Sequence, residues 1–212
     1  MRREEHLPAP AAGAARQRQD RYRHRQEPHG RNEDRQRDRR QGYAGTGLKQ
    51  ISAAAEAPFG SIYHFFPGGK EELGATTLRE GGRFFLTLFG QYADEYPDVV
   101  EAIAAFFDGA AETLIATDYA DACPIATIAL EVSSTSETLR EAAAEAFDSW
   151  LDALAAVFEN AGIAPAQAAP LAAAVLSALE GAFILCRAKR TTEPLAAARD
   201  MAVGAVERAL PR

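Results

Sequence analysis

The sequence predicts an all-α fold, with a short helix-turn-helix near residue 50 followed by a bundle of longer helices. Apolar residues recur at steps of three and four along the chain after Gly42, which is the spacing of one helix face. No run alternates β-branched and polar residues as a half-buried strand does. Eight helices are therefore expected, at about residues 47–55, 59–65, 70–92, 97–114, 124–130, 137–160, 165–186 and 193–210.

The first two of these helices are short and the third is long. Thr46 is the expected N-cap of the first helix, and Pro58 precedes the second. A Pro67-Gly68-Gly69 sequence ends the second helix. The third begins at Lys70, and the acidic residues in its first turn suit the positive end of the helix dipole.

The boundaries of the later helices come from residues that start or stop helices. Pro97 and Pro124 are expected at the openings of two of them. Either Ser136 or Thr138 can cap the next one. Gly162 then supplies a left-handed stop.

The helix expected at 165–186 is apolar enough to need a comparison with a membrane span. Its length is at the lower limit for crossing a bilayer. However, Pro170 and Gly181 interrupt it, and Glu180 would be costly inside the hydrocarbon. We therefore interpret it as a buried or subunit-interface helix, with no membrane partner, and expect Thr192 to cap the helix that follows.

The charge distribution divides the chain at residue 41. The formal net charge is −7, but residues 1–41 contain 12 Arg, no Lys and 7 acidic residues. The remaining residues contain 11 basic and 23 acidic side chains. This contrast and the helix pattern predict three segments, at 1–41, 42–80 and 81–212.

Residues 1–41 are expected to be a disordered Arg-rich tail. Between residues 16 and 41 the one large apolar side chain is Tyr22, so burial cannot offset the entropy of ordering the segment. Three interpretations stay open. The segment is a basic arm that follows DNA phosphates or enters a minor groove, a solvated tail without function, or a stretch that is not the natural sequence, as a reading-frame error upstream of Gly42 would produce.

Two short helices joined by three residues form a helix-turn-helix, whose second helix enters the major groove of double-stranded DNA. The characteristic residues are Gly42-Tyr43, Gly45-Thr46, Leu48-Lys49-Gln50-Ile51, Ala53-Ala54-Ala55, Gly60-Ser61-Ile62-Tyr63-His64-Phe65-Phe66 and Lys70-Glu71-Glu72-Leu73. At these residues the sequence resembles the TetR family of transcriptional regulators. The Pro67 to Lys70 linker and Cys123-Pro124-Ile125-Ala126, followed by Leu130-Glu131, are similar to the branch with lincomycin-resistance and flavonoid-responsive repressors.

The resemblance implies that seven residues contact DNA: Thr46, Lys49, Gly60, Ser61, Tyr63, His64 and Lys70. A hydroxyl and free N–H groups at a helix start can hold a phosphate, and Lys49 adds a positive charge beside Thr46. Alternative roles are a core position for Tyr63, a turn position for Gly60 and a surface position without contacts for His64. The small core that fixes the two helices is expected from Leu48, Ile51, Ile62, Phe65 and Leu73.

Two features depart from the family pattern. Phe59 stands where members usually carry a basic or polar residue, and residues 16–41 lack the large apolar residues of the family's first helix. Without that helix, Ile51, Ile62 and Phe65 would lose part of their cover, at a cost of several kcal/mol. Taken literally, the chain is therefore expected to have a poorly stable or inactive DNA-binding module.

The second half resembles the family's effector-binding and dimerisation domain. Its many aromatic side chains suit a pocket for a small hydrophobic effector, for which the candidates are Phe107, Ile128, Phe147 and Trp150, although ordinary core positions explain such residues equally well. Cys123 is either a redox sensor with a lowered pKa or a packing residue. The homodimer interface is expected at 167–187 and 193–209, where small residues permit close helix packing.

The implied function is that of a ligand-responsive regulator, expected to be a repressor that binds operator DNA as a dimer. Two recognition helices must lie about 34 Å apart to read successive major grooves, and an effector that moves the helix starting at Lys70 would change that separation. The alternative is an all-helical ligand-binding or interaction module that does not bind DNA.

An enzyme is the least expected class. The chain after residue 41 has one histidine, His64, and no motif for a metal or a cofactor. Gly68-Gly69-Lys70 is not a phosphate loop, because His64 stands at the position of the loop's first glycine. Two cysteines and no apolar run after Met1 indicate a reducing compartment, so a cytoplasmic location is expected.

Overall fold

The computed structural model describes residues 42–121 and 123–211. Within these ranges the chain is helical and contains no strand, which confirms the all-α prediction. The expectations for the Arg-rich segment 1–41 lie outside the described residues. Residues 42–45 are helical, and the later helices are α3 Leu48–Ala54, α4 Phe59–Phe65, α5 Gly69–Glu95, α6 Val99–Ala116, α7 Pro124–Val132, α8 Glu137–Asn160, α9 Pro165–Lys189 and α10 Glu193–Ala209.

All eight predicted helices are present, and their ends lie within three residues of the expected ones. Two capping predictions need correction. Helix α6 begins after Asp98, not at Pro97, because the Asp98 carboxylate accepts a hydrogen bond from the Val100 N–H at 2.7 Å. The N-cap of α3 is Gly47, not Thr46.

Other predicted boundaries are confirmed. Ser136 caps α8 by accepting a hydrogen bond from the Leu139 N–H. Gly162 has a positive φ of 94° after α8 ends. Thr192 occupies the N-cap of α10, although its side chain makes no capping hydrogen bond there.

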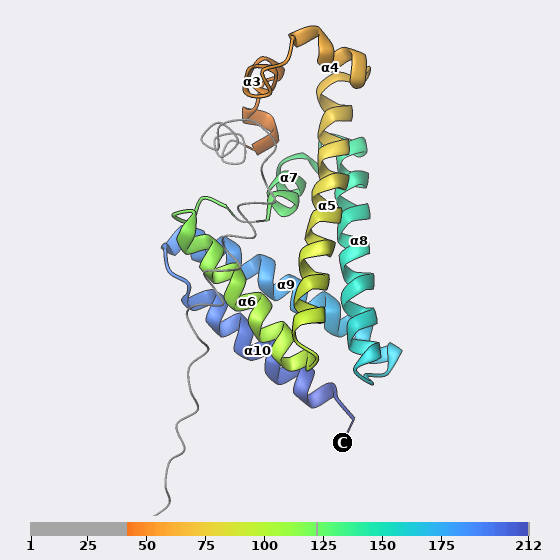
Figure 1. The fold of residues 1–212 in the computed structure, drawn as a ribbon, viewed down its shortest axis with the longest axis vertical. Helices are drawn as coiled ribbons and strands as arrows, with labels where there is room; N and C mark the ends of the chain where they lie inside the picture. Colours follow the sequence, from red (N-terminus) through yellow and green to blue (C-terminus); the bar gives the residue numbers. More distant parts are fainter. Residues whose placement is uncertain (1–41, 122, 212) are drawn as a thin grey trace, which may run out of the picture.

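The helices form an elongated molecule with α3 and α4 at one end (Figure 1). Helix α5 runs from this end into the body, and α8 packs along it. Helices α6, α9 and α10 form the opposite end, where α10 packs on both α6 and α9. The short helix α7 packs on α5 and α8, between the two ends.

The core lies in the body and not in the α3–α4 end. Its largest fully buried side chains include Leu78 of α5, Phe107 of α6, and Leu139 and Phe158 of α8. Burying a side chain of this size contributes about 1.5–3 kcal/mol. In contrast, Ile62 is the one buried hydrophobic residue within α3 and α4. The described part of this end therefore has little core of its own.

Candidate DNA-binding and effector-binding sites

Helices α3 and α4 form a compact helix-turn-helix. The turn begins with Glu56, whose φ of 51° is left-handed, and the Ala57 N–H donates to the Ser52 carbonyl at 2.9 Å. Pro58 then stands at the N-cap of α4. Two consecutive helices at the tip of the molecule, joined by a tight turn, have the connectivity of a DNA-reading module.

The predicted DNA-contacting residues differ in exposure. Lys49, Tyr63 and His64 are exposed, whereas Ser61 and Lys70 are half-buried. A Cβ atom built on Gly60 would meet no heavy atom within 4 Å. Gly60 therefore lies in open space at the start of α4, where a second molecule can approach the backbone.

Thr46 is buried, with 8% of its surface exposed. Its hydroxyl donates a hydrogen bond to the Gly42 carbonyl at 2.7 Å, and its N–H donates to the Tyr43 carbonyl at 3.4 Å. The cap position goes to Gly47, whose N–H donates to the Gln50 side chain at 2.7 Å. Thr46 therefore stabilises the segment that leads into α3. Because its hydroxyl is engaged in this way, Thr46 does not act as the N-cap.

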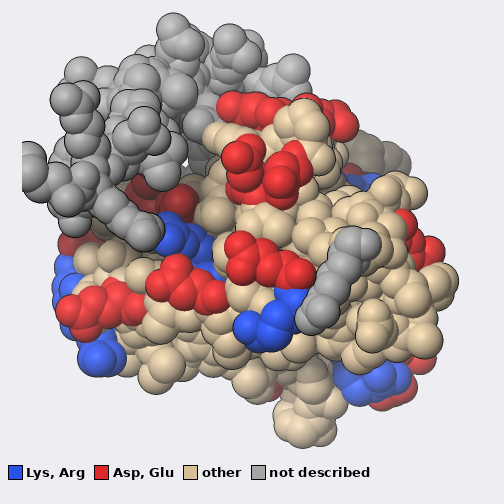
Figure 2. Space-filling model, turned by 90° about the horizontal axis from the view of Figure 1, so that it is seen from below, with Lys and Arg blue, Asp and Glu red and all other residues tan. Residues whose placement is uncertain are grey.

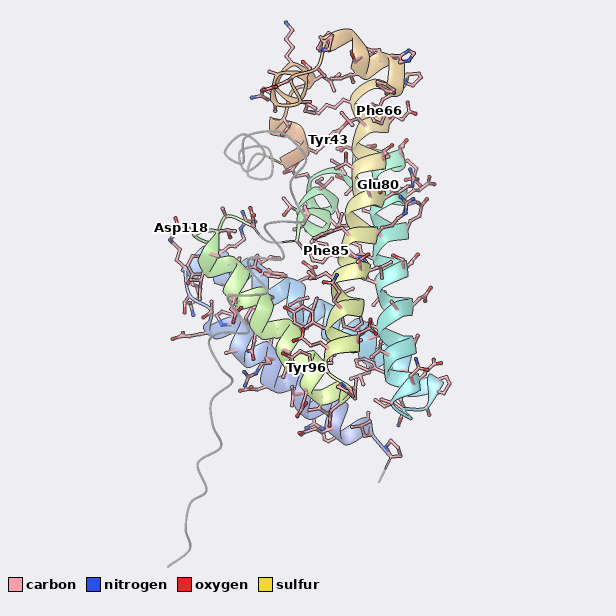
Figure 3. All side chains as sticks on the ribbon, in the orientation of Figure 1. Tyr43, Phe66, Glu80, Phe85, Tyr96 and Asp118 are labelled. Carbon is pink, nitrogen blue, oxygen red and sulfur yellow. The ribbon has the colours of Figure 1, made fainter. Side chains whose placement is uncertain are left out.

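Lys70 lies in the first turn of α5, and its ammonium group sits 4.3 Å from the centre of the Tyr43 ring. This cation–π contact holds the segment 42–45 against α5. The same ring lies next to Gly74, where a Cβ atom would come within 2.9 Å of the ring edge. Figure 3 labels Tyr43 on the segment before α3 and Phe66 beside the start of α5.

The expected place of Phe65 in the small core is wrong, because 71% of the residue is exposed. Leu48, Ile51 and Leu73 are half-buried and Ile62 is buried. Residues four apart share a face of a helix, so α4 turns Ile62 and the half-buried Phe66 inward. Phe65 then falls beside that face and makes an edge-to-face contact with His64.

Phe59 is a candidate DNA-contacting residue that the motif comparison did not assign. It is the first residue of α4, and 42% of it is exposed. Its ring meets the Tyr63 ring edge-on, with the centroids 5.8 Å apart. The two rings present an apolar surface beside Gly60. The position of Phe59 at the start of the second helix was the sequence signal that could have identified it as a candidate DNA-contacting residue.

The four candidate effector-binding residues differ in how deeply they are buried. Phe107 and Trp150 are buried, while Ile128 and Phe147 are partly buried against the core. Trp150 contacts both Phe147 and Phe85, with ring centroids 5.4 and 5.1 Å away. Phe85, which is not one of the four predicted candidates, therefore joins α5 to this aromatic cluster of α8.

An open surface depression of about 400 Å³ lies elsewhere, between α8 and α9. It is lined by Asp148, Leu151, Asp152, Ala155 and Ala169. None of the four predicted effector-binding residues lines it. The residues of the aromatic cluster are instead packed against one another.

Cys123 is buried at the N-cap of α7, where its sulfur accepts a hydrogen bond from the Ala126 N–H at 3.4 Å. Burial, and then the nearby Glu180 carboxylate, raise the pKa of the thiol well above its usual range. The expected alternative of a lowered thiol pKa is therefore wrong. Burial also raises the pKa of Glu180 to about 7, against a smaller opposing effect of its hydrogen bond with Cys123.

Helices α9 and α10 leave a large apolar surface uncovered. Ile184 and Leu185 of α9 and Met201 of α10 are each more than half exposed. By length and composition α9 could cross a membrane, and 33% of its most apolar stretch is buried. The rest of that stretch is half-buried or exposed in a single copy of the chain.

The far end of the molecule, away from α3 and α4, carries several separate groups of acidic side chains with basic ones beside some of them (Figure 2). Arg199 of α10 forms a salt bridge with Asp108 of α6 at 2.9 Å. Among the residues that the structure describes, no group of three or more His, Cys, Asp or Glu side chains could hold a metal ion.

A helix-turn-helix carried at the end of an all-helical body defines a helix-turn-helix transcriptional regulator. Residues 99–201 match the family model described as "Transcriptional regulator LmrA/YxaF-like, C-terminal domain". The chain is 36% identical over 155 residues to the HTH-type transcriptional regulator YxaF of Bacillus subtilis, covering 73% of this chain and 81% of that protein. Its identity to the HTH-type transcriptional regulator LmrA of the same organism is 32%, covering 73% and 82%. The chain belongs to the TetR family of transcriptional regulators.

Solved structures agree with this assignment. A TetR-family regulator from Agrobacterium tumefaciens is 25% identical with a TM-score of 0.66, and the match covers 84% of this chain and 97% of that one. A TetR regulator from Chloroflexus aurantiacus is 26% identical with a TM-score of 0.65, covering 84% and 96%. The relatives are named as regulators and not as enzymes, in line with the expectation from the sequence.

Proposed function

We propose that this TetR-family regulator is a repressor that binds operator DNA as a homodimer and is released by a small hydrophobic effector. The observation that carries the proposal is the exposed surface of the α3–α4 module. There Lys49, Tyr63 and His64 are accessible and Gly60 is unobstructed. The module lies at the tip of the molecule, where it can reach a duplex (Figure 1).

The DNA-binding surface supplies different kinds of contact. Lys49 provides a charge for phosphates, whereas Ser61, Tyr63 and His64 provide donors for phosphates or base edges. Phe59 provides an apolar ring of the kind that contacts thymine methyl groups. Thr46 contributes through the shape of the segment before α3, since its hydroxyl is already bonded to Gly42.

The exposed apolar side chains of α9 and α10 support the proposed homodimer. The exposed apolar side chains Ile184, Leu185 and Met201 favour burial against the same residues of a second copy across a two-fold axis. Small residues of α9, among them Ala173, Ala174 and Gly181, allow the helices of two copies to approach closely. We assign the apolar character of α9 to this contact, and place the regulator in the cytoplasm.

The proposed effector site is the aromatic cluster of Phe85, Phe147 and Trp150. An aromatic effector that inserts there would separate α5 from α8. Because α5 follows α4 after only three residues, Phe66 to Gly68, such a movement would reposition α4. The effector would act allosterically by favouring a dimer whose recognition helices do not match the groove spacing.

A gel-shift titration of the full chain with the duplex upstream of its own gene tests the proposal. We expect a complex that weakens steeply with added salt and that a flat aromatic compound, such as a flavonoid, dissociates. Binding of the flavonoid without any binding of DNA would instead support the alternative, a helical ligand-binding module that does not bind DNA.

A further inference from the structure

Helix α7 makes a direct hydrogen bond to the segment that precedes the helix-turn-helix. Oε2 of Glu131, next to the last residue of α7, accepts a hydrogen bond from the Ala44 N–H at 3.1 Å. The two residues are 87 positions apart in the sequence. This contact therefore joins the body of the molecule to the DNA-binding end independently of the covalent connection through α5.

Gly42 allows the carboxylate to lie this close. A Cβ atom on Gly42 would fall 1.7 Å from Oε1 of Glu131 and 2.6 Å from the carboxyl carbon. Gly42 also has a left-handed φ of 65°, which side chains disfavour. Both the missing side chain and the left-handed backbone conformation of Gly42 thus allow the Glu131 carboxylate to approach.

The contact continues toward α3 through two hydrogen bonds of Thr46. The Gly42 carbonyl accepts the Thr46 hydroxyl, and the Tyr43 carbonyl accepts the Thr46 N–H. Thr46 lies two residues before the first residue of α3. A displacement of residues 42–45 is therefore passed to the first helix of the DNA-binding module.

The other end of α7 is anchored in the body. Cys123 and Ile125 are buried, and Ile125 packs against α5 at Gly81, where a Cβ atom would lie 3.2 Å from its terminal methyl group. A rigid helix of nine residues thus extends from the interior of the body to the segment 42–45.

We propose that Glu131 is a positioning residue that couples α7 to the helix-turn-helix, so that movement of α7 in the body changes the placement of α3. This coupling adds a second connection to the one through α5. The inference rests on the proposed function in one respect: DNA is the ligand whose binding this coupling would transmit to α7. The proposed role requires no direct contact of the carboxylate with DNA or effector.

Amide hydrogen exchange of the full chain tests the positioning role without DNA. Glu131→Ala removes the acceptor of the Ala44 N–H, so we expect exchange across residues 44–54 to accelerate about five- to tenfold. Glu131→Gln keeps an acceptor oxygen and is expected to restore slow exchange. The exposed Glu112 of α6 supplies the control, and Glu112→Ala should leave residues 44–54 unchanged.

A second measurement distinguishes coupling from local stabilisation. Coupling is reciprocal, so binding of the upstream duplex should slow exchange at residues 123–132 of the wild-type chain. The Glu131→Ala variant is expected to lose this effect, and the Glu131→Gln and Glu112→Ala variants to keep it.

Two results would overturn the inference: unchanged exchange at residues 44–54 in Glu131→Ala, or an undiminished effect of DNA on α7 in that variant. Failure of the wild-type chain to bind the duplex would count against the proposed function instead. The exchange measurement in free protein would then still decide whether Glu131 positions the segment before α3.

Discussion

The indole N–H of Trp150 donates a hydrogen bond to the main-chain carbonyl of Gly82 across 2.9 Å, in the buried contact between α8 and α5. The absence of a side chain at Gly82 permits this contact, since a Cβ atom there would lie 2.9 Å from the Cβ of Ala146. The long helices α5 and α8 are thereby held close together. Because α5 connects the body to α4, this contact helps to set the position of α4, the proposed recognition helix.

The Gly82→Ala variant is expected to destabilise the protein. Alanine has the higher helix propensity by about 1 kcal/mol, but the added methyl group must push α5 away from Ala146. Overpacking of this kind costs about 1–3 kcal/mol, so we expect a net loss in the free energy of unfolding, measured by urea denaturation. Gly90→Ala in the same helix meets nothing within 4 Å and should be neutral or stabilising. Equal effects of the two variants would contradict the close packing of α5 and α8.

Lys49→Ala is expected to weaken DNA binding by a similar factor for all sequences. An exposed lysine that contacts one phosphate contributes about one unit to the slope of log affinity against log salt. The variant should therefore reduce that slope by about one, as measured by fluorescence anisotropy at several salt concentrations.

The matched control for Lys49 is Arg83, an exposed cation in the middle of α5 that pairs with Glu80. Arg83→Ala removes the same charge at a distance from α3 and α4, so it should leave the salt slope unchanged. A slope that falls equally in both variants would mean that net charge, and not the α3–α4 surface, governs binding.

Leu185→Glu is expected to convert the proposed homodimer into a folded monomer. The side chain is 54% exposed in a single copy, and a carboxylate buried in a symmetric interface would face its own copy across the two-fold axis. Sedimentation velocity at micromolar concentration should show the monomer mass, with unchanged helical circular dichroism. Ile115→Glu on α6 introduces the same change at another exposed apolar residue, 60% exposed. If this control also dissociates the protein, or Leu185→Glu leaves it dimeric, the assigned interface is wrong.

The raised pKa of Glu180 predicts that the free energy of unfolding depends on pH. Its folded-state pKa of about 7 lies above its ordinary value of 4.5, because burial favours the neutral acid. The folded state therefore holds the proton more tightly, and this contribution is fully present below pH 4.5 and lost as the pH rises through 7. Wild type should lose on the order of 3 kcal/mol between these limits relative to Glu180→Gln.

Urea denaturation of both proteins at pH 5 and pH 8 measures this difference. The exposed Glu141 provides the control, because Glu141→Gln should follow the wild-type pH profile. A wild-type chain and a Glu180→Gln variant with parallel profiles would show that the carboxyl is solvated in the folded protein.

Much of the fold could be predicted from the sequence because its signals are local. Ser136 acts through its own hydroxyl group and Gly162 through its own backbone conformation, and the predicted ends of α8 follow from them. The error at Thr46 is also local in origin, since a threonine before a helix is a typical cap. Here its hydroxyl instead donates a hydrogen bond to the carbonyl of Gly42, four residues earlier in the chain.

The sites were harder to predict because they depend on distant contacts. Phe65 fits a helical apolar pattern, yet the inward face of α4 is set by Ile62 and Phe66. Trp150 was selected for its aromatic character, but its packing against Phe85 and Gly82 depends on the alignment of α5 with α8. The contact of Glu131 with Ala44 joins residues 87 positions apart, and no spacing rule connects them.

The most direct test of the central claim is hydroxyl-radical footprinting of the full chain on the duplex upstream of its gene. Two recognition helices presented by a symmetric dimer should protect two half-sites whose centres lie one helical turn of about 10 base pairs, or a multiple of it, apart. Protection should disappear in Leu185→Glu at concentrations where wild type protects fully. A single protected site, or two sites retained by the monomeric variant, would contradict a dimeric reader of DNA built on α3 and α4.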